Sequence, residues 1–384
     1  MSDSASVKTL QSITEITPHA WNSCRVDDHP FVSHEFLRAL EESGSVSARG
    51  GWMPYHLALE IGGQIAAVAP MYVKGHSQGE YVFDHSWAHA YERAGGRYYP
   101  KLQLAVPFSP VTGPRLLTPA GPRREEYQRL LLTGVRRIAT EHNISSVHLT
   151  FLTEEERDLA AKEGFLIRSG EQFHWVNEGY ETFDDFLGQL SSRKRKAIRK
   201  ERAGATEAGL EFEILSGAEI GEHHWDAFFS FYMDTGSRKW GTPYLNRKFF
   251  SLLGAYLADQ VVLMMVARDG RYIAGALNLK GSDCLYGRYW GCIEDHRFLH
   301  FETCYYRAID YAIKHGLKRV EAGAQGPHKL ARGYLPTETF SAHWFPDPGF
   351  QAAVADFLRR ETREVEAEID YLSAHSPFRK LGDG

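Results

Sequence analysis

The stretch from residue 321 to residue 332 holds the densest group of side chains that could do acid–base chemistry. Its members are a carboxylate, an amide, an imidazole and two cations: Glu321, Gln325, His328, Lys329 and Arg332. General acid–base catalysis needs a group that accepts or donates a proton, and polar groups nearby that hold the substrate and stabilise developing charge. We therefore treat the carboxylate and the imidazole as candidate catalytic groups, and the amide and the two cations as candidate substrate-binding groups.

The position of Glu321 leaves more than one interpretation open. Val320 and Ala322 flank it, so alternation along a strand places its carboxylate on the face opposite the apolar pair. There it could act as a base across a cleft from Lys329 and Arg332. It could equally be a solvated strand residue, or form a salt bridge between the strand and the next turn.

Three further candidates precede this stretch. Glu302 is the third candidate catalytic residue, but it begins a predicted helix, where the helix dipole stabilises a carboxylate by ~0.3 to 1 kcal/mol without any substrate. Arg288 and Trp290 on the preceding strand are candidate substrate-binding residues. If one of them faces a cleft, alternation directs Tyr289 to the other side.

An aromatic and histidine-rich segment in the first half, residues 81–99, has no clean period. Asp84, His85 and His89 in this segment are candidate substrate-binding residues, because together with Trp87 they resemble the wall of a ligand pocket. The alternative is that the segment only covers a hydrophobic core.

The strongest local charge feature is a basic run that comprises Arg193, Lys194, Arg195, Lys196, Arg199, Lys200 and Arg202. As a helix it is basic nearly all round, so we expect it to be exposed. Arg195 and Lys196 are candidate contacts to the phosphates of a tRNA stem or of a diphosphate-bearing precursor. A solvated connector is the alternative.

Composition excludes several classes of protein. The 384 residues are 43% hydrophobic and 24% charged, which is typical of globular domains, and the formal net charge of −5 argues against a general nucleic-acid binder. Neither a signal-peptide-like run nor an apolar stretch of about 20 residues is present, so we expect a cytoplasmic protein without membrane insertion.

No Gly-x-Ser-x-Gly elbow, HExxH or Walker loop occurs, so a serine hydrolase, a zincin and a P-loop enzyme are disfavoured. A metal site is conceivable at Cys292, His296, His300 and Cys304. That spacing is not the spacing of a zinc knuckle, so we expect reduced thiols and no metal.

The candidate residues of the second half belong to a strand–helix–strand unit between residues 272 and 325. Two strands joined at residues 281–283 precede an amphipathic helix that Gly316 ends, and a short strand comes after it. A strand, a helix and a strand predict a parallel pair joined by a right-handed crossover.

The first half repeats this plan. The run HLALEIGGQIAAVAPMYVK matches VVLMMVARDGRYIAGALNLK, and Asn143 falls where Gly316 falls, as expected of residues that end a helix in the left-handed conformation. The sequence thus predicts an α/β protein with two domains, residues 1–178 and 179–384, the second beginning with the basic helix.

The second half resembles the Fem family of peptidoglycan aminoacyltransferases, whose members are tandem GNAT-like acyltransferase domains. The resemblance lies in FDDFLGQLSSRKRKAIRKER, FYMDTGSRKWGTPYLNRKFF, the strand YIAGALNLK and DYAIKHGLKRVEAG, whereas the first half matches in layout only. The chain is most similar to the branch described as peptidoglycan biosynthesis or recognition proteins. The resemblance implies two tandem GNAT-like domains, each a mixed sheet with flanking helices, and a lysine at the position of Lys329.

The function that the resemblance implies is a bacterial cell-wall transferase. It would move an acyl or aminoacyl group onto an amine of a small-molecule or peptidoglycan-precursor acceptor, with its active cleft in the second domain. The donor is acyl-CoA or aminoacyl-tRNA, so tRNA is a candidate partner. The alternatives are a recognition module that binds a peptidoglycan precursor through a GNAT-like pocket without catalysis, and an RNA-binding factor.

One departure from the GNAT pattern bears on the donor. The segment before the second crossover helix, CIEDHRFLHFET, lacks the Gln/Arg-x-x-Gly-x-Gly/Ala loop whose backbone N–H groups hold pyrophosphate, and PFSPVTGPR in the first half also lacks it. We therefore predict weak or no binding of acyl-CoA.

Overall fold

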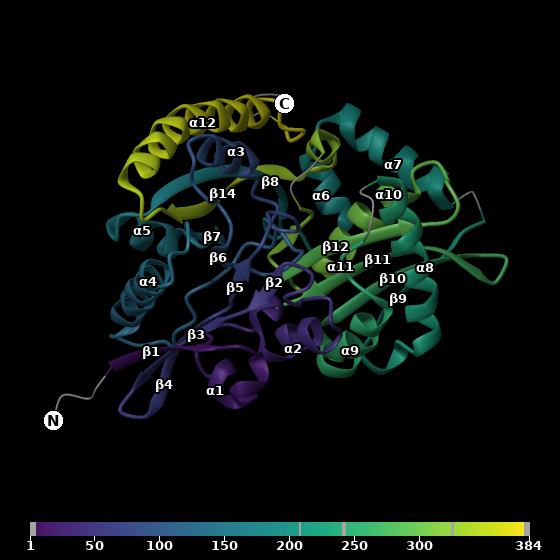
Figure 1. Cartoon of the computed structure of the whole chain (residues 1–384). Helices are drawn as coiled ribbons and strands as arrows, with labels where there is room; N and C mark the ends of the chain where they lie inside the picture. Colours follow the sequence, from purple (N-terminus) through teal and green to yellow (C-terminus); the bar gives the residue numbers. More distant parts are fainter. Residues whose placement is uncertain (1–4, 207–208, 240–242, 324–325, 380–384) are drawn as a thin grey trace. The chain divides into compact units, whose positions relative to one another are not determined.

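The structure is a computed structural model that describes residues 5–206, 209–239, 243–323 and 326–379. The chain forms two compact units (Figure 1). The first unit comprises Met1–Gly170 and Glu338–Glu366, and the second comprises Glu171–Thr337 and Ala367–Gly384. The expected domains, 1–178 and 179–384, differ from these units in two respects: the first division falls at residue 170, and residues 338–366 belong to the first unit.

The first unit holds a sheet in the order β2 (Trp52–Pro54), β5 (Met71–Lys74), β6 (Lys101–Leu104), β7 (Val147–Leu152) and β14 (Leu335–Trp344). β6 and β7 are parallel and are joined through helix α4 (Arg124–Glu141), whereas β5–β6 and β7–β14 are antiparallel. A separate sheet contains β1 (Ala5–Leu10), β3 (His56–Ile61) and β4 (Gln64–Ala69). The other α-helices of the first unit are α1 (Pro18–Asn22), α2 (His34–Glu42), α3 (His85–Arg93) and α5 (Glu154–Lys162).

The second unit holds the strands β9 (Glu211–Ser216), β10 (Val261–Arg268), β11 (Arg271–Lys280), β12 (Cys284–Cys292), β13 (Arg319–Glu321) and β8 (Leu166–Val176), in that order. β12 and β13 are parallel, and the neighbours β11–β12 and β13–β8 are antiparallel. The crossover between β12 and β13 contains α10 (Leu299–Phe301), a π-helical segment η5 (Glu302–Tyr306) and α11 (Arg307–Lys314). The other helices are α6 (Phe183–Gln189), α7 (Ser192–Thr206), α8 (Glu222–Lys239) and α9 (Arg247–Leu257), and α12 (Pro348–Ala374) runs across the last unit boundary.

Both units have the same order of strand pairing around the crossover. In each, an antiparallel pair leads into a parallel pair joined by a helix, and an antiparallel strand comes next: β5-β6-β7-β14 in the first unit and β11-β12-β13-β8 in the second. Asn143 and Gly316 end the two crossover helices at φ angles of 54° and 66°. The predicted α/β fold class is confirmed. The superposition of residues 50–178 on residues 205–346 stays a prediction.

The two crossover helices are held by apolar side chains on one face of each parallel pair. Leu102 and Val147 pack in one core with Leu131 of α4, and Leu285 and Val320 pack in another with Ile309 of α11. Burying each such side chain contributes ~1.5–3 kcal/mol, which keeps the crossover on that face. The opposite face of each parallel pair carries polar side chains.

Candidate functional site

A pocket opens in the second unit where β12 and β13 cease to pair. The two strands pair at residues 284–286 and 319–321 only, and β12 then continues to Cys292. The pocket has a volume of about 110 Å³, and its lining includes Asn278, Arg288, Trp290, His300, Cys304, Tyr305 and Ala322. Two of the predicted substrate-binding residues, Arg288 and Trp290, are therefore brought together here.

A β-bulge interrupts β12 beside this pocket. Leu277 pairs with Tyr289 and Asn278 pairs with Gly287, so Arg288 is an extra residue between the two pairs. A bulge breaks the alternation of side chains, and Tyr289 lines the pocket together with its two neighbours. The ring of Tyr289 nevertheless lies against that of Tyr232 on α8, with 5.3 Å between the centroids, whereas Trp290 packs against the core that contains Ile309 of α11. The expectation that Tyr289 faces away stays a prediction.

The π-helical segment η5 supplies the other wall. Cys304 and Tyr305 both line the pocket from this segment. A π turn adds a residue to the helix and is often found at functional sites, because it changes the direction of the next side chains along the helix. A uniform α-helix was predicted here, and the periodicity of the sequence gives no sign of the wider turn.

Glu321 is fully buried at the end of β13. Its carboxylate oxygens lie 3.4 Å from Nε of Arg319 and 3.8 Å from an Nη atom of Arg288. The interpretation as a solvated strand residue is therefore wrong, as is the expected pairing with Lys329 and Arg332. Its contact with Arg288 suits it to holding that guanidinium at the pocket. A catalytic role for Glu321 stays a prediction.

Lys329 is buried beside the backbone just after β13. Its ammonium group donates to the backbone carbonyl oxygens of Ala322, at 2.6 Å, and Gly323, at 3.0 Å. Burial, and then the charge of Arg288, lower the pKa of Lys329 to about 8. Since Ala322 lines the pocket, an amine that is partly neutral near physiological pH lies at its edge.

His328 and Arg332 lie on the same short helical turn, η6 (Pro327–Arg332). His328 is exposed, and its Nε2 atom is 3.0 Å from the hydroxyl of Tyr305. Arg332 is buried and one of its Nη atoms donates to both oxygens of Glu201, at 2.9 Å each. Gln325 lies outside the described residues.

Glu302 is buried in a network of ion pairs. Its oxygens lie 3.1 Å from Nε of Arg202 and 3.2 Å from Nε of Arg307, and Arg202 also binds Asp310 at 2.6 Å. These contacts account for Glu302 through structure alone, and its catalytic role stays a prediction.

The basic run forms helix α7, as predicted. Only Ile198 and Ala205 of this helix are buried. Arg199 pairs with Asp184 at 2.8 Å. Across the described ranges, neither Arg195 nor Lys196 has an ion-pair partner within 4.0 Å, so both keep their charge available to a ligand.

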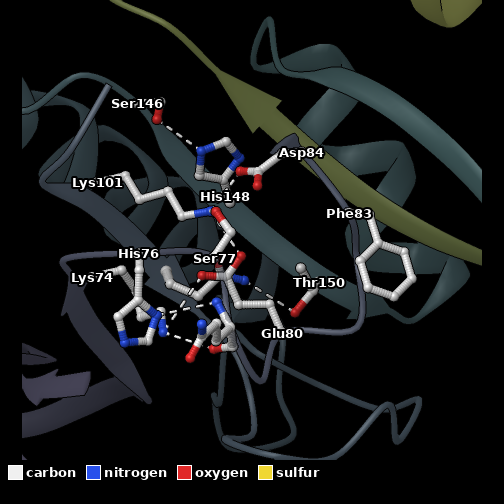
Figure 2. Close-up of polar contacts among 12 residues, drawn as sticks. Lys74, His76, Ser77, Glu80, Phe83, Asp84, Lys101, Ser146, His148 and Thr150 are labelled. Carbon is white, nitrogen blue, oxygen red and sulfur yellow. Dashed lines mark hydrogen bonds and ion pairs between the residues drawn. The ribbon is translucent and has the colours of Figure 1, made fainter. Parts of the chain in front are cut away.

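The residues of the predicted ligand wall in the first unit differ in burial, and their role in binding a ligand stays a prediction. His85 and His89 are exposed on α3, whereas Asp84 is buried. The Asp84 carboxylate accepts a hydrogen bond from the ammonium of Lys101 at 2.5 Å (Figure 2). It also accepts one from the hydroxyl of Tyr98 at 2.7 Å. Burial by itself raises the pKa of Asp84, but the ammonium of Lys101 outweighs it and holds that pKa well below its usual range.

Asp84 belongs to a buried ion cluster that the sequence did not reveal. Lys101 also donates to Glu80 at 2.7 Å and to Ser77 at 2.8 Å, and Lys74 lies 3.6 Å from the other oxygen of Glu80 (Figure 2). The cluster of Lys74, Glu80, Asp84 and Lys101 therefore contains two basic and two acidic groups. Burial lowers the pKa of Lys74 to about 7.

Two histidines lie next to this ion cluster. Nδ1 of His148 on β7 is 2.7 Å from Nδ1 of His343 on β14, and burial lowers the pKa of His148 to about 3. Both rings are therefore neutral at physiological pH. One signal was available in the sequence: KLQL and VHLTF alternate polar and apolar residues, which indicates a second, polar face on β6 and β7.

The described part of the chain contains no group of three or more histidine, cysteine, aspartate or glutamate side chains placed to hold a metal ion. Within the same residues, every helix is too short or too polar to cross a membrane.

A family model described as FemAB-like, peptidoglycan biosynthesis/recognition, matches residues 12–380. Among solved structures, the fold is similar to that of FemX, with 12% identity over 91% of this chain and 100% of that chain and a TM-score of 0.56. It is also similar to the C-terminal domain of a putative lysylphosphatidylglycerol synthetase from Agrobacterium fabrum (10% identity, 90% and 96% of the two chains, TM-score 0.54). L-PGS from Bacillus licheniformis is a further similar structure (10% identity, 87% and 98%, TM-score 0.53). None of the curated proteins matches the sequence.

Proposed function

The chain belongs to the FemAB-like family of peptidoglycan biosynthesis/recognition proteins, and from this we propose that it is a transferase with its active cleft at the pocket of the second unit. It would move an acyl or aminoacyl group onto an amine of a small-molecule or cell-wall-precursor acceptor. The tandem GNAT-like fold supports this class of reaction. Fold alone does not set the substrate, so the side chains at the pocket carry the rest of the argument.

The observation that carries the proposal is the placement of Lys329 and Arg288 at one pocket. In the transfer, the acceptor nitrogen forms a bond to the acyl carbon of the donor. The bond from that carbon to the donor's oxygen or sulfur breaks, and that atom leaves with the bonding electrons and takes up a proton to give the free hydroxyl or thiol. Lys329 has a pKa of about 8, so its neutral fraction can take the proton that the acceptor loses. Arg288 is a buried cation that can stabilise the oxyanion on the acyl group.

Aminoacyl-tRNA is the donor that we favour. The half-buried Arg195 and the exposed Lys196 on α7 are suited to phosphates of a polynucleotide, and the sequence before η5 lacks the loop that holds the pyrophosphate of CoA. One structurally similar protein is named for the synthesis of lysylphosphatidylglycerol, an aminoacylated lipid, which agrees with an aminoacyl donor. The proposal places the reaction in the cytoplasm, where charged tRNA is found.

The test is a transfer assay with purified protein. Elongator tRNAs that carry radiolabelled amino acids are incubated with soluble peptidoglycan precursors, and acetyl-CoA is tested in parallel with the same acceptors. Mass spectrometry of ligands that co-purify with the native protein would indicate which acceptors to include. Label that moves to an acceptor amine, and is lost in Lys329→Met, supports the proposal. Absence of transfer from every charged tRNA contradicts the aminoacyl donor.

A non-catalytic recognition module is the second candidate. The observation that favours it is the ion pairing of Glu321, which removes an unhindered carboxylate base from the pocket. This candidate predicts micromolar binding of a peptidoglycan precursor by calorimetry, unchanged in Lys329→Met, with no product formed from any donor.

A further inference from the structure

The turn η6 carries Lys329 and His328 but has little structure of its own to hold them. It is six residues long and lies between Gly326, at a φ of 113°, and Gly333, at a φ of 88°. Glycine reaches these angles without steric cost and leaves the backbone free to adopt others. The position of η6 therefore depends on contacts with the rest of the second unit.

Arg332, the last residue of η6, makes the strongest of these contacts. One Nη atom donates to both carboxylate oxygens of Glu201, and the other donates to the backbone carbonyl of His328 at 2.7 Å. The guanidinium also lies over the ring of Phe301, 3.4 Å from its centroid. Charge-assisted hydrogen bonds of a buried guanidinium are strong and directional, so Glu201 fixes both the end of η6 and, through Arg332, its start.

Glu201 also reaches the opposite wall of the pocket. It accepts a hydrogen bond from the hydroxyl of Tyr306 in η5. The preceding residue, Tyr305, lines the pocket and is hydrogen-bonded to His328. A single carboxylate thus contacts both η5, which lines the pocket, and η6, which carries Lys329.

Glu201 lies on the basic helix α7, two turns or less from the cations that are available to a ligand. Six residues separate Arg195 from Glu201, which corresponds to ~9 Å along a helix. A helix transmits displacement as a rigid element, so a ligand on α7 and the geometry of η6 can influence each other.

We propose that Glu201 is a positioning residue, which holds η5 and η6 in register through Tyr306 and Arg332 and so couples the basic helix to the pocket. The proposal does not need Glu201 to touch a substrate. Its effect on turnover rests on the proposed transferase function, but its effect on the mobility of η6 does not.

The first experiment therefore measures Lys329 itself. The purified full chain is treated at pH 7.5 with a limiting amine-acylating ester, and mass spectrometry follows Lys329 together with the exposed reference lysines Lys162 and Lys314. In Glu201→Gln, we expect the acylation rate of Lys329 to rise ~5-fold or more, because local opening frees its ammonium from the two carbonyls, while the reference rates stay unchanged.

Asp184→Asn is the matched control, because it removes the exposed ion pair of α7 with Arg199 and does not touch η6. We expect it to leave the rate of Lys329 unchanged. Tyr306→Phe deletes only the hydroxyl that donates to Glu201 and gives a second, milder variant if Glu201→Gln does not fold. It should raise the rate of Lys329 by a smaller factor.

The second experiment uses the transfer assay. We expect Glu201→Gln to lower kcat by ~10-fold with KM for the acceptor unchanged, and Glu201→Asp, which keeps the charge, to restore part of it. An unchanged Lys329 rate in a folded Glu201→Gln protein would overturn the proposal. So would an equal rise at all three lysines, because this indicates general loosening. If no transfer is detected with any donor, the proposed function fails and the labelling result still decides the role of Glu201.

Discussion

The parallel pairs β6–β7 and β12–β13 occupy the same position in the strand order of their units, but the polar side chains that they carry have different surroundings. In the first unit, Lys101 on β6 and His148 on β7 lie in a closed network with Asp84 and Glu80. In the second unit, Arg288 on β12 is one of the residues that line a pocket, and its guanidinium lies 3.8 Å from the buried carboxylate of Glu321 on β13. The same strand order therefore occurs with a filled polar interior in one unit and with a pocket in the other.

The cause of the difference lies in the segments that come after the paired residues. In the first unit, the chain after β6 folds back on itself, and the buried guanidinium of Arg115 donates to the carbonyl oxygens of Val111, Gly113 and Pro114. In the second unit, the bulge at Arg288 and the π turn of η5 open the space between the strands. The second unit thus has a pocket beside local irregularities of β12 and η5, whereas the first unit fills the corresponding region with its own charged side chains.

Lys101→Met tests the buried ion cluster of the first unit and should give the largest change in stability of the variants considered. It leaves Glu80 and Asp84 buried beside a single remaining ammonium, so we expect the free energy of unfolding to fall by ~3–5 kcal/mol. Urea denaturation followed by tryptophan fluorescence measures it. A loss below ~1 kcal/mol would show that the cluster is not a tightly coupled structural network.

Lys329→Met tests the pocket of the second unit. We expect kcat to fall by ~100-fold or more, with the melting temperature within a few degrees of wild type, because the lysine is bound by two carbonyls and not by a carboxylate. The exposed Lys314→Met on α11 is the control and should keep full activity. If Lys329→Met retained activity and instead lost stability, both polar faces would be structural.

The lowered pKa of Lys74 predicts how the stability of the first unit's ion cluster depends on pH. Burial lowers its folded pKa to about 7, far below the value of about 10.4 expected in an unfolded chain. Between these values the unfolded chain binds the proton and the folded protein does not, so this group makes stability rise with pH by up to ~1.4 kcal/mol per unit.

The measurement is the difference in unfolding free energy between wild type and Lys74→Met at pH 7, 8 and 9. We expect wild type to gain stability relative to the variant over this range. Parallel pH profiles would mean that Lys74 stays protonated in the folded protein, paired with Glu80.

The smallest expected effect concerns the surface of the second unit. Arg195→Ala with Lys196→Ala should weaken tRNA binding by about 3- to 10-fold at low salt and reduce the salt dependence, since two phosphate contacts are lost. Filter binding at several salt concentrations measures this. Equal affinity of variant and wild type at low salt would identify α7 as a solvated connector.

The sequence by itself determined the elements and the class of fold. The glycine-flanked hairpins, the two crossover helices with Asn143 and Gly316 at their ends, and the basic helix all arise from local periodicity, turn chemistry and charge. These signals are short-range, because each depends on residues within about two helical turns or one hairpin. The sequence also identified Arg288, Trp290 and Lys329 as candidate substrate-binding residues.

Only the tertiary structure decided which charges meet. Arg332 binds Glu201 across 131 positions and not Glu321 nearby, and His148 lies against His343 across 195 positions. Strands β14 and β8 each join a unit that is built mainly from the other half of the sequence, so no composition shift could mark the unit boundary. Ion pairs and bulges depend on distances between segments that sequence periodicity does not encode, which is why Glu201, Lys74 and Lys101 became visible only in the folded chain.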